Sequence, residues 1–194
     1  AAKQISVGIP MGLQYSITAI GTMMVQSSLN ILGSYAVAAF TAGNKIECIF
    51  TQAFVAIGTT ISTYNAQNIG AGKLDRVRQG FRATDVIGCA YAVIAGFILF
   101  FAGKYFSYLF ISDNADVVIP MVDTYLRCVG MFLVPLYVVN CYRNGFQGMG
   151  YGLLPMLSGV AELVGRGVMA VIAANKKSYT MACMASPFAW VVAT

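Results

Sequence analysis

The sequence contains no histidine and very little charge. Only 10% of its 194 residues are Asp, Glu, Lys or Arg. Without histidine there is no Ser-His or Cys-His pair to activate a nucleophile, and no acidic pair lies where a pocket is expected, so no catalytic residue is predicted. Soluble domains carry about 25% charged residues. Twelve Lys and Arg with seven Asp and Glu cannot coat a soluble globule of this size, so most of the surface must be solvated by lipid.

Paired cysteines are also missing. The five cysteines are scattered singly in or beside apolar segments, at positions Cys48, Cys89, Cys128, Cys141 and Cys183. Without a CxxC spacing, this pattern favours packed thiols over a disulfide framework or a metal site, and no cofactor is expected. The net charge of +5 falls mainly between apolar runs. This placement indicates membrane lipids as partners rather than nucleic acid.

Long apolar runs, in contrast, are abundant, since 58% of the residues are hydrophobic. A transmembrane helix needs about 20 mostly apolar residues. The runs therefore predict an all-α, polytopic membrane protein whose six helices span residues of about 5–32, 46–69, 85–102, 120–142, 153–174 and 178–194. The last run is cut short, and the sequence starts without an initiator methionine. We therefore expect the chain to be part of a longer polypeptide.

The stretch QNIGAGKLDRVRQG (67–80) combines glycines with a dense group of basic residues. A phosphate-binding loop would need G-x-x-x-x-G-K-[ST] between a strand and a helix, but here Lys73 is followed by Leu74. The glycines instead predict a tight reversal after the second span. The positive-inside rule places this basic turn and the N-terminus in the cytoplasm. Lys45 and Glu47 are then expected at the outer mouth of the second span, where they mark the interface.

Polar side chains recur inside two of the predicted spans. In the first, residues four apart draw one gently winding stripe, and the second carries a comparable set. The candidates for lining a substrate cavity are Gln14, Thr18, Thr22, Gln26 and Asn30 in the first span, and Gln52, Thr59 and Thr63, followed by Gln67, in the second. Two interpretations remain open: hydrogen bonds between helices, or a solute pathway lined by both stripes.

Two oppositely charged pairs lie within the spans. Glu162 and Arg166 are four residues apart, as are Asp123 and Arg127. This spacing places both members of a pair on one helix face and predicts ion pairs. Pairing of this kind indicates structural neutralisation rather than a proton relay.

Four motifs resemble one membrane-protein family. NAQNIGAGKLDRVRQG (65–80), YRNGFQGMGYGLLPML (142–157), AELVGR (161–166) and SPFAW (186–190) are similar to the C-terminal half of the multidrug and toxic compound extrusion (MATE) transporters. The resemblance implies two six-helix lobes around a central cavity, with residues 1–194 forming helices seven to twelve. It further implies a bacterial cytoplasmic membrane protein that exports amphipathic organic cations in exchange for sodium or protons, together with the N-terminal lobe.

The sequence departs from some branches of that family at the coupling residues. Those branches carry a glutamate in helix seven, at or near Thr18 here, and an aspartate in helix ten, where this chain has no acid in its core. The chain is more similar to branches whose essential aspartate lies in helix one. The alternatives are a flippase for lipid-linked substrates with a related architecture, and a membrane scaffold or channel subunit. A channel should show a charged ring or a filter motif, and neither is visible in this sequence.

Overall fold

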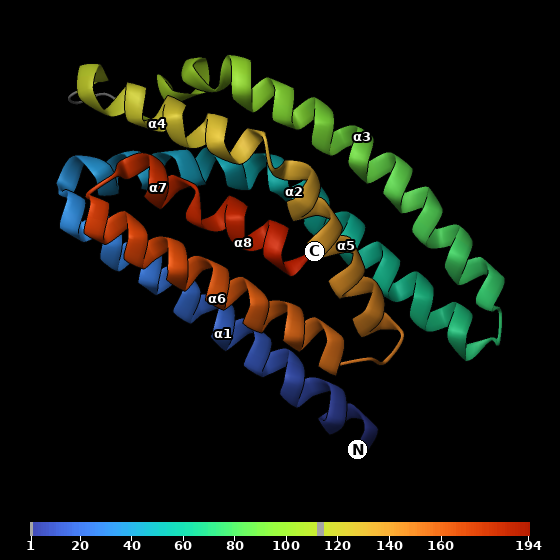
Figure 1. Cartoon of the computed structure of the whole chain (residues 1–194). Helices are drawn as coiled ribbons and strands as arrows, with labels where there is room; N and C mark the ends of the chain where they lie inside the picture. The colour runs from blue at the N-terminus through green and yellow to red at the C-terminus, as the bar shows by residue number, and fades with distance from the viewer. Residues whose placement is uncertain (1, 112–114) are drawn as a thin grey trace.

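The computed structural model describes residues 2–111 and 115–194, with side chains from Gly8 onward. Within these residues the chain is helical and contains no strand. The helices run back and forth along one long axis (Figure 1). Their bounds are α1 Ala2–Leu32, α2 Ser34–Gly70, α3 Leu74–Ser107, α4 Ala115–Gly130, α5 Leu133–Gly148, α6 Leu153–Lys176, α7 Tyr179–Cys183 and α8 Ala185–Ala193.

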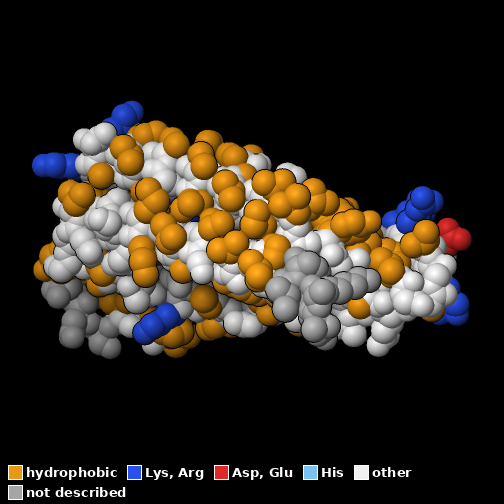
Figure 2. Space-filling view, turned by 90° about the horizontal axis from the view of Figure 1, so that it is seen from below, with side chains coloured by type: hydrophobic (Ala, Val, Ile, Leu, Met, Phe, Trp, Pro, Cys, Tyr) orange, Lys and Arg blue, Asp and Glu red, His pale blue; other side chains and the backbone are white. Residues whose placement is uncertain are grey.

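Three of these helices, α2, α3 and α6, are long and apolar enough to cross a membrane, and α4 with α5 meets the same test as one bent span. At 37 residues, α2 is about 55 Å long, whereas the hydrocarbon layer is about 30 Å thick. In Figure 2 hydrophobic side chains cover the long middle of the visible face, and Lys and Arg lie mainly toward the two ends. This distribution is that of an integral, multi-pass membrane protein.

Two helices start well before their predicted spans. α2 begins at Ser34 rather than near residue 46, and α3 begins at Leu74 rather than at Asp85. For α3 the apolar criterion missed the charged first turns, residues 74–84. For α2 the charges of Lys45 and Glu47 indicated a turn, but the backbone stays helical there. Lys45 and Glu47, predicted at the mouth of a span, lie inside α2 and not at its start; Lys45 is exposed and Glu47 is buried.

The predicted glycine reversal between the second and third helices is confirmed. Gly72 has a φ of 69°, a left-handed conformation that glycine adopts without steric cost. The Lys73 amide donates to the Asn68 carbonyl at 2.8 Å and the Gly72 amide to the Ile69 carbonyl at 3.0 Å. These bonds satisfy carbonyl groups at the end of α2.

The helical path is broken just before a proline at two places. α4 and α5 are bent by 54° at Met131 and Phe132, and Pro135 is the third residue of α5. Likewise α7 ends before Met184, and Pro187 is the third residue of α8. Proline has no N–H to continue the helical ladder and clashes with the preceding turn, so each helix restarts around it.

The helices pack in two groups with α8 between them. α1 lies along α6, while α2, α3, α4 and α5 pack on one another, and α8 contacts both α6 and α5 (Figure 1). Tyr125, Tyr137 and Phe54 are among the large side chains that are fully buried in the second group. α3 and α4 approach through backbone, since a Cβ atom added to Gly96 would lie 2.5 Å from the Gly130 carbonyl oxygen.

Replacing Gly96 with alanine should destabilise the chain, because a methyl group there cannot be placed without moving the backbone of α4. We expect a loss of about 1–3 kcal/mol, the usual effect of overpacking, seen as a lower melting temperature of the purified chain in detergent. Gly12→Ala is the matched control, since nothing lies within 4 Å of a Cβ atom at that position. Equal melting temperatures for the two variants would contradict the close contact.

Candidate functional site

The polar stripe of α1 starts inside the lobe. Gln14 is buried, and its side-chain oxygen accepts a hydrogen bond of 2.9 Å from the Gln147 amide of α5. A Cβ atom added to Gly159 of α6 would lie 3.1 Å from the Gln14 Cγ. Gln14 therefore joins three helices and does not lie on an open face of the lobe.

The stripe then winds outward. Positions four residues apart advance by about 40° around a helix with 3.6 residues per turn. Thr18 is half-buried, whereas Thr22 and Asn30 are exposed. The Thr22 hydroxyl donates to the Ala19 carbonyl at 2.7 Å, and the Gln26 amide donates to the Asn30 oxygen at 3.3 Å. The single stripe predicted from the sequence thus has an inner part that joins helices and an outer part that is open.

The polar side chains predicted to form a stripe on α2 are all exposed. They are Gln52, Thr59, Thr63 and Gln67, and their spacing keeps them within roughly one quarter of the helix circumference. Thr59 and Thr63 donate to carbonyls of their own helix, at 3.1 Å and 3.0 Å. Their oxygens keep free lone pairs as acceptors. A shallow hollow follows the same face and is lined by Thr59, Thr60, Thr63, Tyr64 and Gln67.

A buried charge cluster joins α5 and α6. Glu162 Oε1 lies 2.5 Å from Arg166 Nη2, and Glu162 Oε2 lies 2.9 Å from Arg143 Nη2. The three side chains are only 5%, 8% and 14% exposed for Glu162, Arg166 and Arg143. Arg143 also donates to Ser158 at 3.0 Å, and Arg166 donates to the Thr18 carbonyl of α1 at 3.4 Å. One carboxylate therefore balances two arginines.

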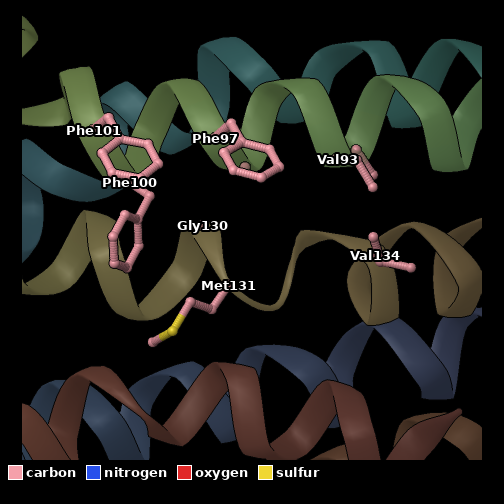
Figure 3. Close-up of a pocket in the computed structure, with 9 residues that line it drawn as sticks. Val93, Phe97, Phe100, Phe101, Gly130, Met131 and Val134 are labelled. Carbon is pink, nitrogen blue, oxygen red and sulfur yellow. The ribbon is translucent and has the colours of Figure 1, made fainter.

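The second predicted pair is peripheral. Arg127 Nε lies 2.8 Å from Asp123 Oδ2, and the arginine side chain is 50% exposed. Its guanidinium lies 5.4 Å from the centre of the Phe100 ring on α3. Beside it an apolar pocket of about 350 Å³ opens at the bend between α4 and α5, lined by Phe97 and Phe101 of α3 on one side and by Met131 at the bend on the other (Figure 3). The pocket offers no polar side chain to a ligand.

The structure adds one buried acid that the sequence analysis placed at the interface. Glu47 is only 8% exposed, and its Oε2 accepts a hydrogen bond from the Tyr125 hydroxyl of α4. The Asn44 amide donates to the same hydroxyl oxygen at 3.4 Å. An acid inside an apolar run was the available signal. It was missed because residues 33–45 read as a loop.

The cysteines differ in exposure. Cys128, Cys141 and Cys183 are buried, as expected of packed thiols, whereas Cys48 is exposed on α2. Within the described ranges no three His, Cys, Asp or Glu side chains are grouped so that they could hold a metal ion.

Comparison with known proteins fits this arrangement. The MatE family model matches residues 10–172, which is most of the chain. This chain belongs to the MATE family. Members of this family are membrane transporters rather than enzymes.

Two curated relatives of this MATE chain come from Bacillus subtilis (strain 168). The chain is 29% identical over 157 residues to the probable multidrug resistance protein YpnP, covering 81% of the chain and 35% of the relative. It is 31% identical over 75 residues to the probable multidrug resistance protein YoeA, covering 39% and 16%. The chain thus spans about a third of the first relative's length.

Two solved structures share the fold. One is a MATE protein crystallised in complex with MaD3S, with a TM-score of 0.90, 16% identity, and coverage of 98% of this chain and 43% of that one. The other is a MOP superfamily transporter from Pyrococcus furiosus, with a TM-score of 0.86, 21% identity, and coverage of 97% and 43%. At these identities the likeness describes the fold of a part of each transporter.

Neutralising Glu162 should destabilise this MATE chain strongly. Glu162→Gln leaves Arg143 and Arg166 buried without a counter-charge, which typically costs about 3–5 kcal/mol. The matched control is Asp123→Asn, which breaks the half-exposed pair and should cost no more than about 1 kcal/mol. Thermal unfolding of both variants in detergent measures the difference. Similar losses would contradict a structural role for the Glu162 cluster.

Proposed function

We propose that this chain is the C-terminal, six-helix lobe of a secondary-active exporter in a bacterial cytoplasmic membrane. The exporter moves amphipathic organic cations outward in exchange for protons or sodium, by rocking two lobes around a central cavity. Family membership and the names of the two Bacillus relatives support a multidrug transporter. The sequence motifs around residues 65–80 and 142–157 support the assignment to the C-terminal half.

The observation that carries the proposal is the open polar face of α2. Polar side chains inside a membrane are costly against lipid, so they face protein or a wet cavity. Gln52, Thr59 and Thr63 are exposed in this lobe although they lie in a membrane-spanning helix. We infer that this face, with Thr22, Gln26 and Asn30 of α1, lines the cavity between the lobes.

The proposed topology follows from the charges. Arg76, Arg78 and Arg82 lie in the first turns of α3, next to the reversal at Gly72. The positive-inside rule then orients the α2–α3 end toward the cytoplasm. In this arrangement α1 and the α7–α8 pair complete six spans.

The first test asks whether both lobes are needed. This chain alone, reconstituted in proteoliposomes, should not move ethidium against a gradient, because half of the cavity wall is absent. Co-expression with the matching N-terminal half should restore efflux driven by an imposed proton or sodium gradient. Robust transport by the lobe alone would contradict the proposal, and lipid scrambling without ethidium efflux would favour the flippase.

The second test addresses the α2 face. In the full-length transporter, Thr59→Val removes one hydrogen-bonding group from the inferred cavity and should raise the apparent KM for ethidium about two- to tenfold, the value of one hydrogen bond. Thr124→Val on α4, whose hydroxyl donates to the Pro120 carbonyl at 2.9 Å, is the control and should leave the KM unchanged. If both variants behave alike, the α2 face is not the substrate surface.

A further inference from the structure

Glu47 is a buried carboxylate without a basic partner. Among the ion pairs of the described residues, Glu162 and Asp123 each contact arginine, whereas Glu47 contacts none. The residue lies 13 positions after Ser34, about 20 Å along the helix axis. A charge removed from water in this way is costly unless a cation or a proton compensates it.

The Glu162 cluster holds the opposite imbalance. Glu162 carries one negative charge against the positive charges of Arg143 and Arg166, so this cluster has a net charge of +1 (2 − 1). The charges of Glu47, Glu162, Arg143 and Arg166 therefore sum to zero when Glu47 is ionised, and to +1 when it is protonated.

The surroundings of Glu47 suit a proton. No three His, Cys, Asp or Glu side chains of the described residues are grouped so that they could hold a metal ion. The neighbours are instead a phenol and an amide, Tyr125 and Asn44. Both can donate or accept a hydrogen bond, so they can accommodate either form of the carboxyl group.

We propose that Glu47 is a proton-carrying residue of this lobe, which takes up and releases one proton during each transport cycle; this inference rests on the proposed exporter function. In the ionised state the Tyr125 hydroxyl donates to the Glu47 carboxylate. When a proton binds to the carboxylate, the new carboxyl O–H donates to the Tyr125 oxygen. The Asn44 amide then turns over, so that its oxygen leaves Cys48 and accepts from the Tyr125 hydroxyl. The only covalent bond formed is the carboxyl O–H.

This change acts on the bent span. A hydrogen bond to an ionised carboxylate is stronger than one between neutral groups, so protonation weakens the attachment of α4 to α2. Tyr125 lies in α4, shortly before the bend at Met131 and Phe132. α5, on the other side of the bend, remains held to α6 through Arg143 and Glu162. Protonation of Glu47 thus loosens α4 from α2, while α5 stays attached to α6.

Ionisable groups from other helices lie around Glu47. Tyr125 of α4 donates to it, and Arg166 of α6 and Cys183 of α7 are the others that act on this pair. Tyr91 of α3 lies near the following turn of α2 and donates to the Phe50 carbonyl at 2.8 Å. Cys48 is the next residue on α2 itself. Glu47 is the carboxyl among these groups, and the pH dependence of transport should follow it.

The test uses the full-length transporter in proteoliposomes, with ethidium as the substrate. Two rates are measured: transport driven by a pH gradient, and counterflow exchange without any gradient. Glu47→Gln, which imitates the protonated carboxyl, should lower the pH-driven rate about tenfold or more, within the usual range of coupling between sites, while counterflow continues. Asp123→Asn is the matched control and should retain both rates.

A second variant tests how the transport rate depends on pH. Tyr125→Phe keeps the carboxyl but removes the donor that stabilises its ionised form. The pH of half-maximal transport should therefore move upward, which a purely structural role of Tyr125 would not produce. If Glu47→Gln fails to fold, Glu47→Asp replaces it and should also shift this profile. An unchanged profile in these variants overturns the inference.

The outcomes separate the two proposals. If the wild-type protein moves no ethidium with either a proton or a sodium gradient, the exporter function fails. If it transports but Glu47→Gln remains fully driven by the pH gradient, or if only sodium drives the wild type, the function stands and the role of Glu47 is overturned. Should Glu47→Gln lose counterflow as well, proton release on ethidium binding in detergent decides: the wild type should release protons and the variant should not.

Discussion

The double ion pair of Glu162 is the constraint on which the lobe's architecture depends. It ties Arg143 of α5 to Arg166 of α6, and Arg166 reaches on to the Thr18 carbonyl of α1. In a membrane there is little water between helices to drive their association, so polar contacts and close packing must hold them together. Neither arginine could remain buried without this carboxylate. The group formed by α1 and α6 is thereby joined to the group formed by α2 to α5, and the remaining contacts follow that placement.

The same constraint separates polar residues that hold the lobe together from those that are available to a substrate. Gln14 is buried and accepts a hydrogen bond from Gln147. Asn30, about four turns further along α1, is exposed. On α2 the spacing keeps Gln52 and Thr63 on one open face. Identical residue types therefore serve two purposes, and helical geometry decides between them.

Much of this could be predicted from local sequence patterns, and the rest depends on packing between distant segments. The ion-pair spacing at Glu162 and Arg166 and the reversal at Gly72 are local, so the sequence indicated both. The role of Arg143 could not be predicted, because it reaches Glu162 from another helix across a bend. Glu47 was misplaced for a different reason: the charges of Lys45 and Glu47 indicated a turn, but α2 had already formed 12 residues (46 − 34) before the predicted span. The burial of Glu47 depends on Tyr125, 78 positions away.

The cysteine pattern gives this lobe a natural reporter. Cys48 is exposed, whereas Cys128, Cys141 and Cys183 are buried, so thiol reagents should find it first, ahead of the half-buried Cys89. Cys48 follows Glu47 directly in the chain, and its thiol donates to the Asn44 side-chain oxygen at 3.8 Å. A water-soluble maleimide and a membrane-permeant one would therefore distinguish an aqueous from a lipid environment beside the buried acid, with the native sequence intact.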